Sequence, residues 1–520
     1  MRFTTSGRLL GFVFFLHACV GAAVGLSVDE AHYLLYALHP ALSYFDHPPL
    51  VGWVQWPLVA LGAPVAVLRL IPGLLWLATA FGVYRLTLLL FAHGAAQVQR
   101  GASELAYALP NHAEKPQAQR AGLWALAALL LAPVLHVLGI GLLPDTLLMA
   151  LSVALMAQTM RLMDAQLAKR PGPWLLLGAL LGLAGLAKYT AIFTAIAVAA
   201  CLLHAHGWRL LRNPWLWACT ALALLLVLPV LVWNAQNSWI SFVYQAKHGS
   251  GSTWELAHVL RFLLIQLTSY GALLLWGLYG LYGLWGSRAL VAPQQRVLLL
   301  FFAIPFVVFT AMAGGGSSLP HWTAPAWVAL APFAGLGLAR FWSEAQRAGR
   351  ALLLGLLFLQ LLACTALLGL MLSAGQPWFA SKQGNPFADL HGWEAAGQRA
   401  RYLARNHRLT AVAVQNWTLA SRIGWAARQI PVHVLQDRYD QFDMWSGDLT
   451  PNTKVLLLDW SQMPFPLPVG AGKFASCQWL ASQEVQRWGT HVSQFSFYSC
   501  TGWQGAPKRW PSAKTSTTAP

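Results

Sequence analysis

Two acidic groups flank an aromatic stretch near the N-terminus, within residues 28–52. Asp29 and Glu30 follow directly on an apolar run, and Asp46 and His47 precede two prolines. Charged groups at the mouth of an apolar segment are costly unless water, a partner or a ligand receives them. A carboxylate in such a setting can act as a general base on a hydroxyl, because burial and neighbouring charges tune its pKa. We therefore interpret this stretch as the chemical centre.

Further polar side chains lie just outside other apolar runs. Asp145 is in the turn LLPDT, Lys188 lies between two apolar runs, and His321 follows a glycine-rich loop. Lys188 and Arg69 are cations that can neutralise a departing phosphate. Transfer of a sugar from a lipid phosphate needs such a cation as well as a carboxylate on the acceptor side. The remaining candidates for the site are Tyr33, Tyr44, Trp233 and Asn234.

Each of these residues also has a purely structural interpretation. Asp29, Glu30 and Asp145 can cap the helices that follow them. Lys188 and Arg69 can anchor helices at the lipid headgroups, while His47 and His321 can be ordinary turn or interfacial residues. What favours a site is that all of them fall on one side of the membrane once the topology below is applied.

The composition indicates a protein with many membrane spans. Of its 520 residues, 57% are hydrophobic and 10% are charged, and the mean hydropathy is +0.51. Soluble domains carry about 25% charged residues. A net charge of +17 would suggest nucleic acid for a soluble protein, but here the simpler cause is Lys and Arg gathered in cytoplasmic loops.

A span needs about 20 apolar residues, and eleven segments meet this pattern. We expect spans near 8–27, 65–92, 121–140, 143–163, 173–187, 189–207, 214–233, 256–284, 295–313, 322–340 and 350–373. Basic residues concentrate in alternate loops, which puts the N-terminus in the cytoplasm. Residues 27–64 and everything after about residue 375 are then outside. The first span resembles a signal peptide, and we expect it to be retained.

The region after residue 375 changes character. We predict helices over 391–407 and 418–428 and strands over 409–417, 431–435 and 453–460, which together indicate a small α/β domain. We place the domains at 1–375 (membrane part), 376–505 (outer α/β domain) and 506–520 (disordered tail). Cys477 and Cys500 can pair there if the compartment is oxidising. The other four cysteines lie in apolar runs, and no His, Cys and Asp cluster has metal-site spacing, so we assign no metal ligands.

Several motifs, in this order, resemble one bacterial family. DEAHYLLYALHPALSYFDHPPLVGW, LPDTLL, GLAKYT, PVLVWNAQNSWISFVYQ and PHWTAPAW resemble segments of the enzymes related to protein O-mannosyltransferases and to the aminoarabinose transferase of lipid A (glycosyltransferase families 39 and 83). The resemblance covers about residues 1–375, and more loosely DLHGWEAAGQRAR and RYDQFDMW in the C-terminal domain. This sequence departs from the family in having His32 where many members have an aromatic residue.

The resemblance implies a GT-C glycosyltransferase, an α-helical polytopic membrane protein whose site faces the periplasm. By similarity, Asp29 would be the base or acceptor-positioning acid with Glu30 beside it, Asp145 a second acid, and Lys188 the partner of the donor phosphate. His321 would lie near the donor, and Tyr33, Tyr44 and Trp233 would line the cavity. The donor would be a polyprenyl-phosphate sugar, usually of undecaprenyl phosphate, with inversion in one displacement and no further cofactor.

The acceptor stays open at this point. We expect a lipid A or other cell-envelope glycan acceptor and a location in the bacterial inner membrane, with membrane lipids but no nucleic acid as partners. A protein O-mannosyltransferase-like enzyme is the main alternative. A lipid-linked-sugar flippase would have polar residues and broken helices near the membrane midplane, and a receptor or scaffold would use the α/β domain alone. The predicted gathering of acids in the membrane part favours the enzyme.

Overall fold

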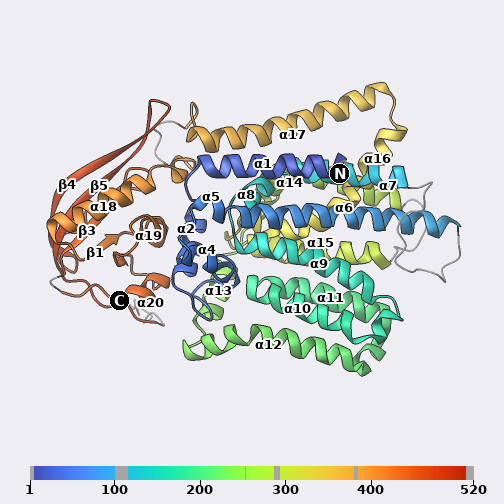
Figure 1. The fold of residues 1–520 in the computed structure, drawn as a ribbon, viewed down its shortest axis with the longest axis horizontal. Coiled ribbons are helices and arrows are strands. Elements are labelled where there is room, and N and C mark those ends of the chain that lie inside the picture. Colours follow the sequence, from blue (N-terminus) through green and yellow to red (C-terminus); the bar gives the residue numbers. More distant parts are fainter. Residues whose placement is uncertain are drawn as a thin grey trace.

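The structure is a computed structural model, and it describes residues 5–99, 115–251, 253–285, 293–379, 384–451 and 453–510. Long helices run side by side in one body, and a sheet domain lies at one end of them (Figure 1). Short helices, among them α2 and α4, fill the space between these two parts (Figure 1). This junction is the region to which the sequence assigns the polar residues.

Every one of the eleven predicted spans is occupied by helix. The long helices are α1 (Thr5–Ala23), α6 (Leu70–Gln99), α7 (Lys115–Leu130), α8 (Pro133–Ile140), α9 (Pro144–Leu162), α10 (Pro171–Ala187), α11 (Ala191–His206), α12 (Pro214–Gln236), α14 (Leu256–Trp285), α15 (Pro293–Ala313), α16 (Ala324–Glu344) and α17 (Arg347–Ser373). Among the described residues, eight helices are long and apolar enough to cross a membrane, or nine if α7 and α8, bent by 81°, form one span. The multi-pass helical fold is confirmed, whereas the number eleven stays a prediction.

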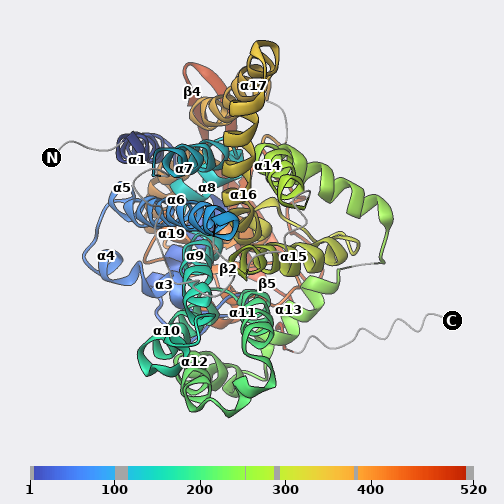
Figure 2. The same cartoon turned by 90° about the vertical axis from the view of Figure 1, so that its right-hand side faces the viewer.

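Helix α16 forms the centre of the bundle (Figure 2). It is buried on nearly all sides from Ala324 to Gly335, whereas the outer helices α12 and α17 expose most of their apolar side chains. Close approach depends on glycine, because a Cβ at Gly280 of α14 would lie 2.1 Å from the carbonyl oxygen of Phe333. Small residues at such contacts let helix backbones approach in the absence of a hydrophobic driving force.

Shorter elements cover the end of the bundle nearest the sheet domain. They are α2 (Val28–Leu38), α3 (Leu50–Trp53), α4 (Trp56–Ala60), α5 (Val65–Leu68), α13 (Ile240–Ser250) and the 3-10 turn η3 (Pro320–Thr323). Other 3-10 turns are η1 (Leu167–Lys169), η2 (Gly207–Arg212) and η4 (Ala388–Leu390). Helix α2 begins with a capping box, in which Ser27 accepts from the Glu30 amide and Glu30 accepts from the Ser27 amide.

The C-terminal domain is a five-stranded mixed sheet with strand order β2-β1-β3-β5-β4. Its elements are α18 (Trp393–His407), β1 (Ala411–Val414), α19 (Trp417–Ala426), β2 (Val432–Val434), α20 (Gln441–Ser446), β3 (Val455–Trp460), β4 (Phe474–Arg487) and β5 (Thr490–Trp503). Strand β1 is parallel to β2 and β3, and β5 is antiparallel to β3 and β4. The α/β character is therefore confirmed, and the β4–β5 hairpin is the part that we did not predict.

Cys477 of β4 and Cys500 of β5 form a disulfide between paired positions of this hairpin. Of the predicted tail, residues 511–520 lie outside the described residues. Residues 506–510 are described, and Lys508 of this segment makes an ion pair with Asp443 of α20 (Nζ to Oδ1, 2.7 Å).

Helix α2 joins the two parts of the molecule. Ala31, Leu34 and Leu35 on one of its faces belong to the same apolar core as the buried residues of the C-terminal domain. His32 Nδ1 lies 3.0 Å from the hydroxyl of Ser421 on α19. The helix that carries the first acids is therefore held between the bundle and the α/β domain.

Candidate functional site

A cavity of about 190 Å³ lies at this junction. Six of the sequence-predicted site residues line it: Asp29, Tyr33, His47, Asp145, Lys188 and His321. They come from α2, the loop after it, the start of α9, the end of α10 and the turn η3. The structure therefore gathers polar groups from five separate segments into one hollow.

The bundle side of the cavity holds a buried charge pair. Asp145, in the first turn of α9, lies 2.6 Å from the Nζ of Lys188, measured to its Oδ1. The side chains are only 3% and 6% exposed, so their attraction is weakly screened. His321 Nε2 is 3.8 Å from the other carboxylate oxygen of Asp145, and Lys188 Nζ lies 5.7 Å from the centre of the Trp322 ring. An ammonium has three donors, so Lys188 can pair with Asp145 and still donate to an oxyanion in the cavity.

Among the four carboxylates that line this cavity, Asp29 has the fewest partners. No hydrogen bond or ion pair to its side chain is found in the part of the chain that the structure describes. Burial raises the pKa of Asp29 to about 6; the positive field of His32 opposes this shift, and the acids Asp389, Asp145 and Asp46 add to it. A carboxylate with a raised pKa is a stronger base once ionised. Asp29 is thus suited to take a proton from a group in the cavity.

His32 and Asp46 form a second polar pair beside Asp29. His32 Nε2 lies 3.4 Å from Asp46 Oδ2, and Tyr36 donates its hydroxyl proton to Asp46. The Ser421 hydroxyl donates to the Trp417 carbonyl at 2.8 Å, so His32 Nδ1 must donate to Ser421 and Nε2 must donate to Asp46. Burial acts to raise the pKa of Asp46, but His32, His47 and the Tyr36 hydrogen bond together outweigh it, and the pKa falls below its usual range.

His47 provides a neutral polar group in the same wall. Burial lowers its pKa to about 4, against the opposing effect of Asp46, so the ring is uncharged near neutral pH. Its ring lies edge-on to Tyr33, 5.5 Å between centroids. A neutral imidazole offers one donor and one acceptor, which suits hydrogen bonds to hydroxyl groups.

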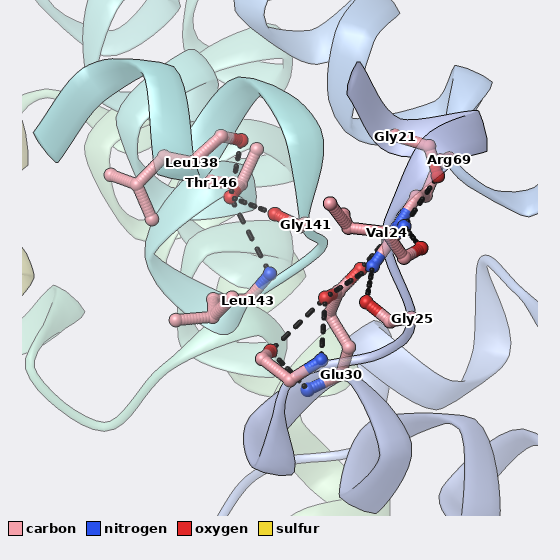
Figure 3. Close-up of polar contacts among 10 residues, drawn as sticks. Gly21, Val24, Gly25, Glu30, Arg69, Leu138, Gly141, Leu143 and Thr146 are labelled. Carbon is pink, nitrogen blue, oxygen red and sulfur yellow. Dashed lines mark hydrogen bonds and ion pairs between the residues drawn. The ribbon is translucent and has the colours of Figure 1, made fainter. Parts of the chain in front are cut away.

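Glu30 and Arg69 do not line the cavity. They form a two-point ion pair, with 2.8 Å from Arg69 Nε to Glu30 Oε1 and 2.9 Å from Nη2 to Oε2 (Figure 3). Arg69 also donates to the carbonyls of Gly21, Val24 and Gly25 at the end of α1 (Figure 3). The sequence assigned Glu30 to catalysis and Arg69 to the donor phosphate, whereas the structure uses both to fix the start of α2 against α1.

Tyr44, Trp233 and Asn234 also lie outside the lining. Tyr44 stacks on Tyr36 with 3.6 Å between ring centroids and donates its hydroxyl to the Tyr36 carbonyl at 2.7 Å. Asn234 accepts from the Ser241 amide at 3.2 Å and so ties α12 to α13, and Ser241 donates in turn to the Tyr44 carbonyl at 2.8 Å. Trp233 precedes this turn and is half-buried. These residues support the loop that holds Asp46 rather than face the cavity.

The C-terminal domain supplies a part of the lining that we did not assign. Its contributors are Trp417, Arg438, Asp440, Gln441 and Phe442. Gln441 Oε1 accepts from the Phe45 amide at 2.8 Å, which fastens α20 to the first loop. Burial and Asp443 raise the pKa of Asp440 to about 6. RYDQFDMW (438–445) was the sequence signal for this wall, although nothing in its spacing says which residues face the cavity.

The described residues contain no set of side chains that could ligate a resident metal ion. Among the described residues, no group of three or more His, Cys, Asp or Glu side chains is arranged to hold a metal ion.

Comparisons with known proteins agree with this architecture. Residues 111–233 match the family model described as dolichyl-phosphate-mannose-protein mannosyltransferase. A crystal structure of ArnT from Cupriavidus metallidurans in the apo state shares 16% sequence identity, covers 94% of this chain and 97% of its own, and gives a TM-score of 0.58. The structure of the same protein bound to undecaprenyl phosphate also shares 16% sequence identity. It covers 96% of this chain and 98% of its own, with a TM-score of 0.56. A search of curated protein sequences finds no significant match.

The family model spans less than a quarter of the chain, while the structural similarity spans nearly all of it. The fold expected from the sequence motifs is thereby confirmed, including the small C-terminal sheet domain. This chain is a polytopic membrane protein of the GT-C fold, similar in structure to ArnT and, within residues 111–233, in sequence to the mannosyltransferase family.

Proposed function

We propose that this protein is a membrane glycosyltransferase that transfers a sugar from a polyprenyl-phosphate donor, such as undecaprenyl-phosphate sugar, to lipid A or another cell-envelope glycan. The observation that supports it most is the shared cavity, where the Asp29 carboxylate and the Lys188 ammonium face one space. That ArnT has been crystallised with undecaprenyl phosphate adds support for the donor class. In this proposal the cavity faces the periplasm of an inner-membrane protein.

In the proposed reaction, the bond between the sugar C1 and the donor phosphate oxygen breaks as the acceptor oxygen forms a new bond to C1. The electron pair leaves with polyprenyl phosphate. Lys188 would donate to that phosphate, and Asp145 holds its Nζ at 2.6 Å in place. Charge-assisted contacts of this kind stabilise a departing anion in a water-poor site.

Asp29 would serve the acceptor. For a hydroxyl acceptor it would take the proton that leaves as the new bond forms, and its pKa of about 6 keeps it ionised at neutral pH. For a phosphate acceptor, which is already ionised, Asp29 would position the group rather than deprotonate it. His32, whose Nε2 lies 3.4 Å from Asp46 Oδ2, would hold Asp46 in place beside Asp29.

The acceptor would approach from the side of the C-terminal domain. Arg438 lies at the rim of the cavity, 5.5 Å from the centre of the Tyr244 ring, and is exposed. An exposed guanidinium at the mouth can contact an anionic group of an envelope lipid. The donor would bind on the bundle side of the cavity, next to Lys188 and His321.

A direct assay tests this proposal. Purified protein in nanodiscs is mixed with labelled undecaprenyl-phosphate sugars and an envelope lipid extract, and the lipids are analysed by mass spectrometry. Transfer of label to an envelope lipid is the expected result. Lys188→Ala should weaken donor binding while the protein stays folded by thermal unfolding. Movement of labelled donor across the bilayer without transfer, or donor binding unchanged by Lys188→Ala, would contradict the proposal.

A further inference from the structure

A second cavity, of about 350 Å³, is lined by the C-terminal domain and the start of the segment that follows it. Its lining shares no residue with the cavity at the membrane bundle. The segments that follow all three parallel strands contribute to it: Gln415 after β1, Gln436 and Asp437 after β2, and Phe465 after β3.

The topology of the sheet marks this place as a ligand site. The chain passes from β1 to β2 on one side and then returns to β3 on the other side of β1. In open α/β sheets, ligands bind outside the carboxyl ends of the strands at such a switch point. The second cavity opens where residues directly after β1 and β2 meet, so its position agrees with this rule.

Its polar groups are available to a ligand. The side chains of Gln415, Gln436, Asp437 and Lys473 line the cavity. Within the described part of the chain, none of these four side chains makes a hydrogen bond or an ion pair with the protein. Two amides, a carboxylate and an ammonium together offer donors and acceptors in roughly equal number. Such a set fits a ligand with many hydroxyl groups.

The charge balance argues against an anionic ligand. Lys508 is engaged by Asp443 at 2.7 Å, and its amide donates to Asp448 at 2.8 Å. Asp437 and Asp448 then face a single further cation, Lys473. A phosphate would meet this acidic excess and be repelled. The rings of Phe465 and Trp503 add apolar surface, which suits the carbon face of a sugar ring.

One segment forms the wall between the two cavities. Gln436, Asp437 and Asp443 line the second cavity, whereas Arg438, Asp440, Gln441 and Phe442 line the first. The wall is braced within itself, because the Asp440 amide donates to Asp443 Oδ2 at 2.7 Å. One short segment, residues 436–443, therefore contributes to the lining of both cavities.

We propose that the second cavity binds an uncharged saccharide unit of the acceptor glycan, while the first cavity holds the unit that receives the sugar. That this glycan is the acceptor rests on the proposed function. Saccharide binding itself does not require transfer, so the two can be tested apart. The second cavity would give the protein selectivity for an acceptor with an extended glycan over one without it.

The test uses the full chain in nanodiscs and, as probe, an uncharged hexose oligosaccharide that carries neither phosphate nor carboxylate groups. Saturation-transfer NMR should show binding to the wild type. The double variant Gln436→Ala, Asp437→Ala should bind about tenfold more weakly, as expected for the loss of two hydrogen bonds. Gln478→Ala, an exposed change on β4, should leave binding unchanged.

Two outcomes would overturn the proposal: no binding of the probe to the wild type, or equal binding to the double variant. Both changed residues are exposed, so the fold should survive, and thermal unfolding checks this. If the probe binds as expected but no sugar is ever transferred, the proposed function fails and the saccharide site stands. If transfer occurs and the double variant binds normally, the second cavity alone is refuted.

Discussion

At the scale of single residues, acids that are neighbours in the sequence have different environments. Glu30 is held by two hydrogen bonds from Arg69 and by the Ser27 amide, whereas Asp29 faces the cavity with no such partner. The helical turn sends adjacent side chains about 100° apart, so one acid serves the structure and the other is left for chemistry. The sequence identified both acids as candidates but could not show that only Asp29 faces the cavity.

The raised pKa of Asp29 predicts a pH dependence. A folded-state pKa of about 6 lies above the ordinary value of 3.8, so the group is protonated and inactive as a base below pH 6. With a hydroxyl acceptor, kcat/KM should rise with pH through about 6 and become flat above neutral pH. Initial rates across this range measure it. Rates that do not change between pH 5 and 7 would rule out Asp29 as the base for that acceptor.

His32 provides a second test at this scale, because its positive charge holds the pKa of Asp29 down. The variant His32→Phe removes that charge, so the rising limb of the pH–rate profile should move to higher pH and the rate at pH 6 should fall several-fold. His407→Phe, an exposed change at the end of α18, is the matched control. If the rising part of the pH–rate profile stays at the same pH in His32→Phe, His32 does not change the pKa of Asp29.

At the scale of elements, the helix ends decide what reaches the cavity. Lys188 directly follows α10, and Asp145 lies in the first turn of α9, so both are positioned by helix termini. The sequence located these ends because Pro, Gly and polar residues interrupt the apolar runs. It could not show that Tyr44 and Asn234 turn inward to brace the loop, because side-chain direction in an irregular segment depends on contacts far along the chain.

The Glu30–Arg69 pair should matter for stability more than for chemistry. Removal of one partner of a buried ion pair costs about 3–5 kcal/mol, because the other charge is left uncompensated. Glu30→Gln and Arg69→Gln should therefore lower the melting temperature strongly, while the protein that stays folded keeps its donor binding.

Thermal unfolding in detergent, with donor binding measured on the folded fraction, checks this prediction. Arg340→Gln is the matched control, because the Arg340–Glu344 pair is about half exposed and should change stability by less than about 1 kcal/mol. If the melting temperature of Arg69→Gln equals that of the control, the Glu30–Arg69 ion pair does not stabilise the contact between α1 and α2.

At the scale of the whole molecule, the bundle and the α/β domain together make the cavity. The sequence was sufficient for the helical membrane part, because apolar runs and basic loops are local signals. It also predicted α18, β1, α19, β2 and β3 close to where they lie. It could not place Trp417 or Arg438 against Asp29, because contacts between residues nearly 400 positions apart leave no trace in composition or spacing.

The disulfide tests the side of the membrane on which this domain lies. Cys477 and Cys500 are joined across β4 and β5, and such bonds persist in oxidising compartments. Alkylation of intact membranes without reductant should leave both cysteines unmodified, while prior reduction should expose them and lower the melting temperature of the domain by several degrees. Labelling after denaturation and reduction, which make all six cysteines accessible, reports labelling efficiency. Free thiols at 477 and 500 before reduction would contradict a periplasmic domain.

The central claim is that Asp29 and Lys188 face one donor–acceptor cavity, and one rate measures it most directly. The initial rate of sugar transfer from labelled undecaprenyl-phosphate sugar is compared between wild type and Asp29→Asn, with both proteins folded and binding donor equally. We predict a loss of about 10²–10⁴ in rate, the usual contribution of a positioned acid or base. A variant that transfers sugar at the wild-type rate would contradict the account.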